Sequence, residues 1–211
     1  MRERDQENLD FLWHSFLDGD EKVFSVIYQQ HINRLLSYGH KLCPNHEWIH
    51  DSIQEVYLDL FLKRKKLNGR KIENLKAYLF VSFRNKLLKK ILQEKKFQAL
   101  RLNGELESGL FQAEYNIQNQ IVEFELSKEI KEALVKAVNS LPARQKEIIY
   151  LKFEEELEYS EISDILKISI DSARKLVYRA LISLRKTLDP KMVQVLFYIF
   201  QKNNQLFVSM F

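Results

Sequence analysis

The stretch LEYSEISDILKISIDSARKLVYRALISLRKT, residues 157–187, carries the clearest structural pattern in the chain. Its first part has a short apolar face, and residues 167–169 interrupt it. Apolar residues then recur at i, i+3, i+4, i+7, i+8 and i+11, at Ala173, Leu176, Val177, Ala180, Leu181 and Leu184. Ser169 is placed to cap this second helix, with Asp171 in its first turn. Two short helices joined by a tight turn predict a helix-turn-helix, whose second helix can enter a DNA major groove.

Polar and cationic residues occupy the other face of the second helix. Arginine offers a planar fork for guanine edges or phosphates, and serine near the helix N-terminus can reach a base or the backbone. Exposed basic residues often only solubilise a helix, but the turn and the cap together favour nucleic-acid contact. We expect DNA contacts from Ser172, Arg174, Lys175, Tyr178 and Arg179.

The composition of the whole chain favours an all-α fold. The 211 residues include only five Gly and three Pro, so long helices are expected. The single Cys43 excludes an internal disulfide framework and fits a reducing cytoplasm. The first ten residues lack the apolar core of a secretory signal, and the apolar run near residues 195–200 is too short to span a bilayer. We therefore expect a cytoplasmic protein with no membrane span.

Charge alternates in blocks along the chain. Residues 63–71 hold six basic side chains and no acidic one, and residues 84–96 hold six and one. Acidic residues prevail at 101–133 and 144–164, and basic residues prevail again at 167–191. Two basic zones on either side of an acidic one indicate two contacts with a polyanion. The alternative is that these blocks are only solvated helix faces.

Helical periodicity also runs through the first half of the chain. Gly19 breaks it, Asp20 is a candidate cap, and residues 43–45 mark a loop. Amphipathic helices are predicted at 49–62 and 74–92, and periodicity is lost from 97 to 125. The expected segments are a helical N-terminal stretch (1–19), a helical domain (20–96), a linker (97–125), a second helical domain (126–189) and an apolar extension (190–211).

The two amphipathic helices each carry a candidate binding face. On the first, an exposed leucine lies among carboxylates and an amide, which is typical of a protein-docking surface. The candidate docking residues are Asp51, Gln54, Glu55 and Leu58. The alternative is that this face is only solvated. The second has more apolar residues than one buried stripe needs, with cations threaded among them. Aromatics can stack on unpaired bases while cations hold the backbone, and core packing is the alternative for most of them. The candidates here are Tyr78, Arg84, Asn85, Lys86 and Lys89.

Residues 20–188 resemble the extracytoplasmic-function (ECF) group of bacterial sigma factors. DSIQEVYL at 51–58 resembles the family's D-[IV]-x-Q-E-x-F-L segment, and AYL at 77–79 followed by RN at 84–85 resembles its A-[YW]-L…R-N helix. LP at 141–142 stands where the second domain opens, and EIS at 161–163, IS at 168–169 and RA at 179–180 fall at the spacing of the helix-turn-helix.

The resemblance implies a role for each segment. The domain at 20–96 would be sigma region 2, which docks on the polymerase clamp helices through the face at 51–58 and reads and melts the −10 element, with Asn85 near a flipped base. The domain at 126–189 would be region 4, which reads the −35 element and touches the polymerase flap. The linker would run near the RNA exit path. The implied partners are core RNA polymerase, promoter DNA and an anti-sigma factor.

Three residues depart from the family pattern, and one of them, Ser163, replaces a usual Ala in a small-for-small change. The family commonly has Arg where this chain has Leu176, and periodicity places Leu176 in the core, so one DNA contact is in question. The turn usually carries Gly where Lys167 stands, and a positive φ there would cost a lysine roughly 1 kcal/mol.

Other patterns point away from catalysis. His40, Cys43, His46 and His50 match no zinc-finger spacing, and the sequence contains no Gly-rich phosphate loop, so we expect neither a metal or other cofactor nor an enzyme. The apolar extension would fold back on one of the domains or be covered by a partner. Two other functions stay open: a stand-alone helix-turn-helix regulator that needs no polymerase, and a protein that sequesters sigma or polymerase.

Overall fold

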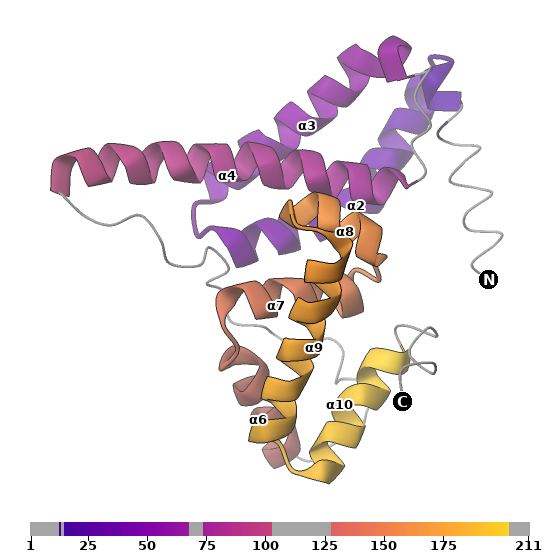
Figure 1. Ribbon diagram of the computed structural model, residues 1–211. Helices are drawn as coiled ribbons and strands as arrows, with labels where there is room; N and C mark the ends of the chain where they lie inside the picture. The colour runs from indigo at the N-terminus through magenta and orange to yellow at the C-terminus, as the bar shows by residue number, and fades with distance from the viewer. Residues whose placement is uncertain (1–12, 14, 68–73, 103–127, 203–211) are drawn as a thin grey trace. The chain divides into compact units, whose positions relative to one another are not determined.

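The computed structural model describes Trp13 and residues 15–67, 74–102 and 128–202 (Figure 1). Within these ranges every regular element is helical, which confirms the all-α class. The chain divides into two compact units, residues 1–106 and 107–211, and each is described by itself.

Unit 1 contains α2 (Glu21–Leu42), α3 (His46–Leu67) and α4 (Leu75–Leu102). The predicted break and cap at its start are confirmed, because Gly19 has a φ of +106° and the Asp20 carboxylate accepts a hydrogen bond of 2.9 Å from the Lys22 N–H. The predicted loop at residues 43–45 separates α2 from α3. Asn45 then caps α3 by accepting a bond of 3.0 Å from the Trp48 N–H.

The core of unit 1 lies where its three helices meet. Phe80 and Phe83 of α4 are fully buried and lie against Tyr38 of α2, with ring centroids 5.2 and 6.3 Å from it. A Cβ at Gly39 would come within 2.7 Å of Ile49 and 2.9 Å of Phe83. The glycine therefore permits the close approach of α2 to α3 and α4. This packing determines which side chains of the three helices remain on the surface.

Helix α4 is longer than the sequence pattern predicts. It ends at Leu102, whereas the predicted helix ended at residue 92 and the predicted linker began at residue 97. The stretch QEKKFQALRL at 93–102 has no clear apolar stripe, but most of its residues are strong helix formers. Helix propensity therefore explains why α4 continues beyond the amphipathic sequence pattern.

Unit 2 contains α6 (Lys128–Asn139), α7 (Ala143–Ile149), a π-helical turn η1 (Tyr150–Glu154), α8 (Tyr159–Leu166), α9 (Ile170–Thr187) and α10 (Pro190–Lys202). The break predicted at residues 141–142 is confirmed, since α6 ends at Asn139 and Pro142 precedes α7.

Buried polar groups hold η1 and the bend that leads into α8. The Tyr150 hydroxyl donates a bond of 2.8 Å to the carboxylate of Glu155, which is 3% exposed. The Lys152 ammonium donates a bond of 3.0 Å to the Leu157 carbonyl. These bonds satisfy polar groups that would be costly to bury alone, and they fix where α8 begins.

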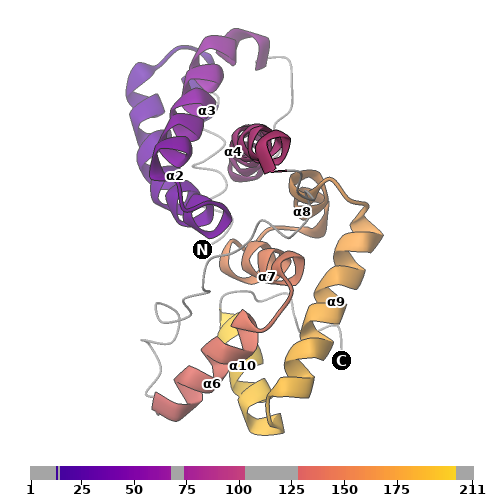
Figure 2. The same cartoon turned by 90° about the vertical axis from the view of Figure 1, so that its left-hand side faces the viewer.

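The start of the apolar extension forms α10, which packs within unit 2. The Asp189 carboxylate caps it by accepting bonds of 2.8 and 2.9 Å from the N–H groups of Lys191 and Met192. The helix lies beside α6 and α9 (Figure 2). Leu196 of this helix is only 1% exposed. For residues 190–202 this supports the expectation that the extension folds back on a domain, while residues 203–211 lie outside the described residues. No helix in the described ranges has the length and hydropathy that a bilayer crossing requires.

Candidate nucleic-acid interface

The turn between α8 and α9 has the geometry of a helix-turn-helix. Lys167 ends α8 in the left-handed conformation, with φ 53° and ψ 50°, which confirms that this position demands a positive φ. The Ile168 N–H donates a bond of 3.0 Å to the Ser163 carbonyl and closes the turn. At the other end of α8, Glu158 and Glu161 form a capping box.

Helix α9 begins at the predicted cap. The Ser169 hydroxyl accepts a bond of 3.1 Å from the Ser172 N–H, and Asp171 lies in the first turn. The prediction that Leu176 belongs to the core is wrong, because Leu176 is partly exposed while Ala173 and Val177 are buried. Leu176 is one residue, about 100° around the helix, from Val177, and therefore lies on the flank of the buried stripe.

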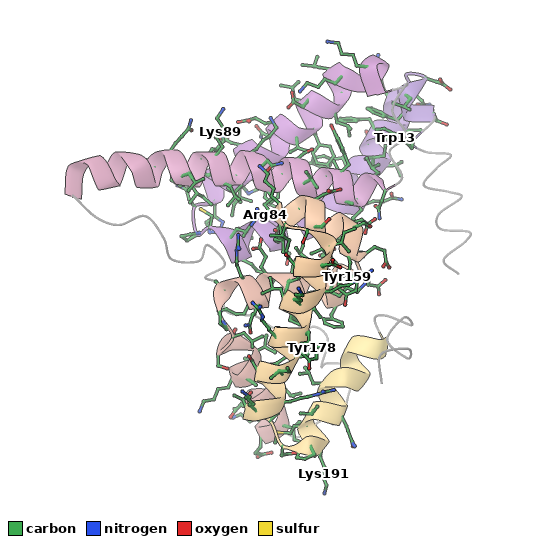
Figure 3. The ribbon with its side chains drawn as sticks, viewed as in Figure 1. Trp13, Arg84, Lys89, Tyr159, Tyr178 and Lys191 are labelled. Carbon is green, nitrogen blue, oxygen red and sulfur yellow. The ribbon has the colours of Figure 1, made fainter. Side chains whose placement is uncertain are left out.

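All five predicted contact residues of α9 are exposed to solvent: Ser172, Arg174, Lys175, Tyr178 and Arg179. Tyr178 extends from the middle of α9 and is 62% exposed (Figure 3). The structure therefore places these side chains on the solvent-exposed part of α9, where they are accessible to a DNA groove.

Tyr159, which the sequence analysis did not single out, lies next to Arg174. Its ring centroid is 5.8 Å from the Arg174 guanidinium and 4.9 Å from the Lys152 ammonium. Partial burial raises the pKa of Tyr159, although Arg174 opposes the shift. Asp171 also holds Arg174, with an N–O distance of 3.4 Å. In the sequence, the only sign of the contact between Tyr159 and Arg174 was an aromatic residue at the first position of α8.

The predicted strand-binding residues on α4 fall on different sides of the helix. Tyr78, Asn85 and Lys89 share one face at i, i+7 and i+11, and Lys89 is exposed while the other two are partly exposed. Arg84 leaves α4 on another side and is only 8% exposed (Figure 3). The structure thus gives Arg84 a place in the packing of unit 1, and its burial does not support the expectation that it contacts DNA.

Lys86 lies on the flank of α4 that meets α3, and Lys90 lies one turn further along the same flank. The Lys86 ammonium is 2.8 Å from Asp59 and 3.4 Å from Glu55, and the Lys90 ammonium is 2.9 Å from Glu55 and 3.3 Å from Asp51. We call these five residues the α3–α4 ladder. The hydrogen bond from Lys90 lowers the pKa of Glu55, and the hydrogen bond from Lys86 lowers the pKa of Asp59. The hydrogen bond to Asp59 likewise raises the pKa of Lys86, so the Lys86–Asp59 pair stays charged near neutral pH.

The predicted docking residues line an open groove on α2 and α3. Asp51, Gln54, Glu55 and Leu58 are all exposed, and Leu58 is 57% exposed. The groove has a volume of about 670 Å³, and its aromatic walls come from Phe24, Tyr28, Tyr57 and Phe61. Their rings pack edge to face, with centroids 5.5 Å apart for Phe24 and Phe61 and 4.8 Å apart for Tyr28 and Tyr57. We call this feature the α2–α3 groove.

The part that α2 plays in the groove was not evident from the sequence. Phe24 and Tyr28 fit the apolar period of α2, but the structure leaves Phe24 partly exposed and Tyr28 39% exposed. The helical period alone does not reveal which residues of an apolar stripe stay uncovered by the neighbouring helix. The only sign in the sequence was the pair of aromatic residues at i and i+4, which lie next to each other on one helix face.

The histidines near Cys43 pack against each other without forming a metal site. The rings of His40 and His46 have centroids 4.6 Å apart, and Cys43 is buried. Burial, with His46 and His50 nearby, lowers the pKa of His40. Across the described part of the chain, no group of three or more His, Cys, Asp or Glu side chains is arranged to hold a metal ion.

Comparison with known proteins identifies both units. Residues 27–97 match the family "Sigma-70 region 2" and residues 131–184 match "Sigma-70, region 4", which together make up more than half of the chain. The chain is 25% identical over 154 residues to the ECF RNA polymerase sigma factor SigM of Bacillus subtilis (strain 168), covering 73% of this chain and 88% of that protein.

A solved structure has the same fold. The sigma factor RpoE of Bartonella quintana, crystallised with the anti-sigma factor NepR, superimposes with a TM-score of 0.53 at 21% identity over 79% of this chain and 96% of that chain. With region 2 and region 4 in that order, the chain belongs to the sigma-70 family as an ECF-type sigma factor, a non-enzymatic protein that directs promoter recognition by RNA polymerase.

Proposed function

We propose that this sigma factor docks on the clamp helices of core RNA polymerase through the α2–α3 groove, holds the separated −10 strand on α4, and places α9 in the major groove of the −35 element. Residues 20–96 and 126–189 are the two functional domains, and residues 97–125 connect them near the RNA exit path. Region 4 also touches the polymerase flap.

The observation that carries this proposal is the α2–α3 groove. Leu58 and Tyr28 are large apolar side chains left 57% and 39% exposed, and Asp51, Gln54 and Glu55 line the same groove. An apolar centre with a polar rim is the usual anatomy of a protein-docking surface. A stand-alone regulator has no use for such a groove beside its strand-binding helix, so the groove favours a polymerase-bound factor.

On α4, the proposed strand contacts are Tyr78, Asn85, Lys86 and Lys89. An aromatic ring can stack on an unpaired base, an amide can read a base edge, and lysines can neutralise phosphates. Lys89 is exposed on the same face as Tyr78 and Asn85, so one strand can meet all three groups. Capture of extruded bases offsets the few kcal/mol that each costs to unstack and unpair, and no nucleotide hydrolysis is needed.

On α9, the proposed −35 contacts are Ser172, Arg174, Lys175, Tyr178 and Arg179. The capped N-terminus of α9 points N–H groups and short polar side chains outward, which suits phosphates and base edges at the mouth of a major groove. Tyr159 and Asp171 restrict the orientation of Arg174 before it meets DNA.

An anti-sigma factor is the proposed inhibitor. The relative from Bartonella quintana was crystallised with one, and the α2–α3 groove is an exposed apolar surface that such a partner could mask.

Co-purification of the full chain with core RNA polymerase tests the proposal. The protein should co-elute with core polymerase in size-exclusion chromatography, and the complex should bind promoter DNA. A regulator would instead bind duplex DNA equally well without polymerase, and a sequestering protein would bind polymerase but never promoter DNA.

A further inference from the structure

The α2–α3 groove has charges of opposite sign at its two ends. Asp51 and Glu55 are exposed carboxylates at the end nearer the start of α3. Phe61 lines the other end, and the Arg64 guanidinium lies over its ring, 4.5 Å from the centroid. Arg64 follows Phe61 by one helical turn, so the two side chains are neighbours on one side of α3. The groove is therefore acidic at one end and cationic at the other.

The setting of Arg64 differs from that of the basic residue before it. The Lys63 ammonium is 3.0 Å from the Asp59 carboxylate, so its charge is paired within α3. Among the residues that the structure describes, Arg64 contacts the Phe61 ring and no carboxylate within ion-pair distance. A guanidinium held over an aromatic ring can still donate from its N–H groups, and it loses less side-chain freedom when a partner binds. Arg64 is therefore a preorganised donor at the end of the groove.

We propose that Arg64 is a further docking residue, which receives a carboxylate of the polymerase surface that enters the α2–α3 groove. The inference rests on the proposed function, because it specifies the partner surface of the same groove. The matching polymerase segment has an apolar stripe against Leu58 and the aromatic walls. It carries a cationic side chain against Asp51 and Glu55, and an acidic side chain against Arg64.

The separation of the two charged ends sets the spacing of charges on the partner. Glu55 and Arg64 lie about 14 Å apart along the axis of α3, at about 1.5 Å per residue. An α-helix that lies along the groove therefore needs its cationic and acidic residues about nine positions apart. The opposite direction would bring a carboxylate against Glu55, where the like charges repel each other. The groove thereby favours one direction of the docked segment.

Equilibrium binding of fluorescein-labelled full-length variants to core RNA polymerase tests the contact. The dissociation constant should rise at least roughly tenfold in Arg64→Gln, the loss typical of a hydrogen bond between charged groups. Arg64→Lys keeps the charge but lacks the planar fork, so its dissociation constant should lie between those of Arg64→Gln and the unaltered protein. The difference between Arg64→Gln and the unaltered protein should narrow as the salt concentration rises, because salt screens an ion pair. A loss that is independent of salt and follows the unfolding midpoint would mean that Arg64 only stabilises the fold, and would refute the proposal.

The matched control is Lys63→Gln, which removes the same charge from the adjacent position, outside the lining of the groove. Lys63→Gln should leave polymerase binding unchanged. Equal losses in Lys63→Gln and Arg64→Gln would show that net charge is responsible, and would refute the proposal. Unaltered binding by Arg64→Gln would refute it as well.

A charge exchange tests whether the partner group is acidic. Each carboxylate of the clamp helices is replaced in turn by lysine, and one of these core polymerases should restore binding by Arg64→Glu. If none restores binding, no carboxylate of that surface meets Arg64 and the proposal is wrong. Failure of the proposed function looks different, because the unaltered protein itself would then not bind core polymerase.

Discussion

Truncation of Leu58 to alanine should weaken polymerase binding by an amount that follows from its exposure. Burying a whole leucine side chain is worth about 1.5–3 kcal/mol, and Leu58 is 57% exposed, so the docked complex gains about 0.9–1.7 kcal/mol from covering it. The dissociation constant for core polymerase should rise roughly four- to sixteenfold in Leu58→Ala, since about 1.4 kcal/mol is a factor of ten. Equilibrium binding of labelled protein to core polymerase measures this change.

The same helix supplies the control for this prediction. Leu62 is 68% exposed on α3 but does not line the α2–α3 groove. Leu62→Ala should leave polymerase binding unchanged, and neither variant should lower the unfolding midpoint, because both side chains are mostly in solvent. Equal losses in the two variants, or no loss in Leu58→Ala, would refute the assignment of the groove.

Three further substitutions probe the other surfaces. Asn85→Ala should impair promoter opening, followed by permanganate reactivity of unpaired thymines, more than it impairs recruitment in a gel-shift assay. Arg174→Ala should weaken −35 binding by about 1–3 kcal/mol and relax specificity at one position if it makes a bidentate base contact, whereas a loss that is uniform across sequences would reveal a phosphate contact instead. Leu196→Ala should lower the stability of unit 2 by about 2–5 kcal/mol in denaturant unfolding, because Leu196 is 1% exposed, while a null effect would mean that α10 is not docked. The exposed neighbour Gln194→Ala should be neutral.

Local features of the fold could be predicted from sequence because neighbouring residues determine them. Asp20 and Ser169 cap their helices by accepting hydrogen bonds from N–H groups two and three residues away. The left-handed conformation of Lys167 follows from the tight turn between α8 and α9, which begins at this residue. Short-range hydrogen bonds and turn sterics depend on the residue types at neighbouring positions, so a single sequence is enough to predict them.

Features that depend on which helices meet could not be predicted in this way. Leu176 was assigned to the wrong environment, and the burial of Arg84 was not foreseen, because the width of a buried stripe is set by the helices packed on it. The α3–α4 ladder joins residues separated by 31 and 39 positions, so no local period reveals it. The end of α4 was missed for a different reason, since helix propensity outlasted the amphipathic pattern.

Run-off transcription with purified core polymerase and a pool of candidate promoters tests most directly whether this protein directs promoter recognition. Discrete transcripts should appear only when core polymerase and this protein are both present, and Leu58→Ala should require more protein for the same yield. Transcripts that do not depend on the protein, or none from any promoter despite a stable complex with polymerase, would contradict the claim that it directs promoter recognition.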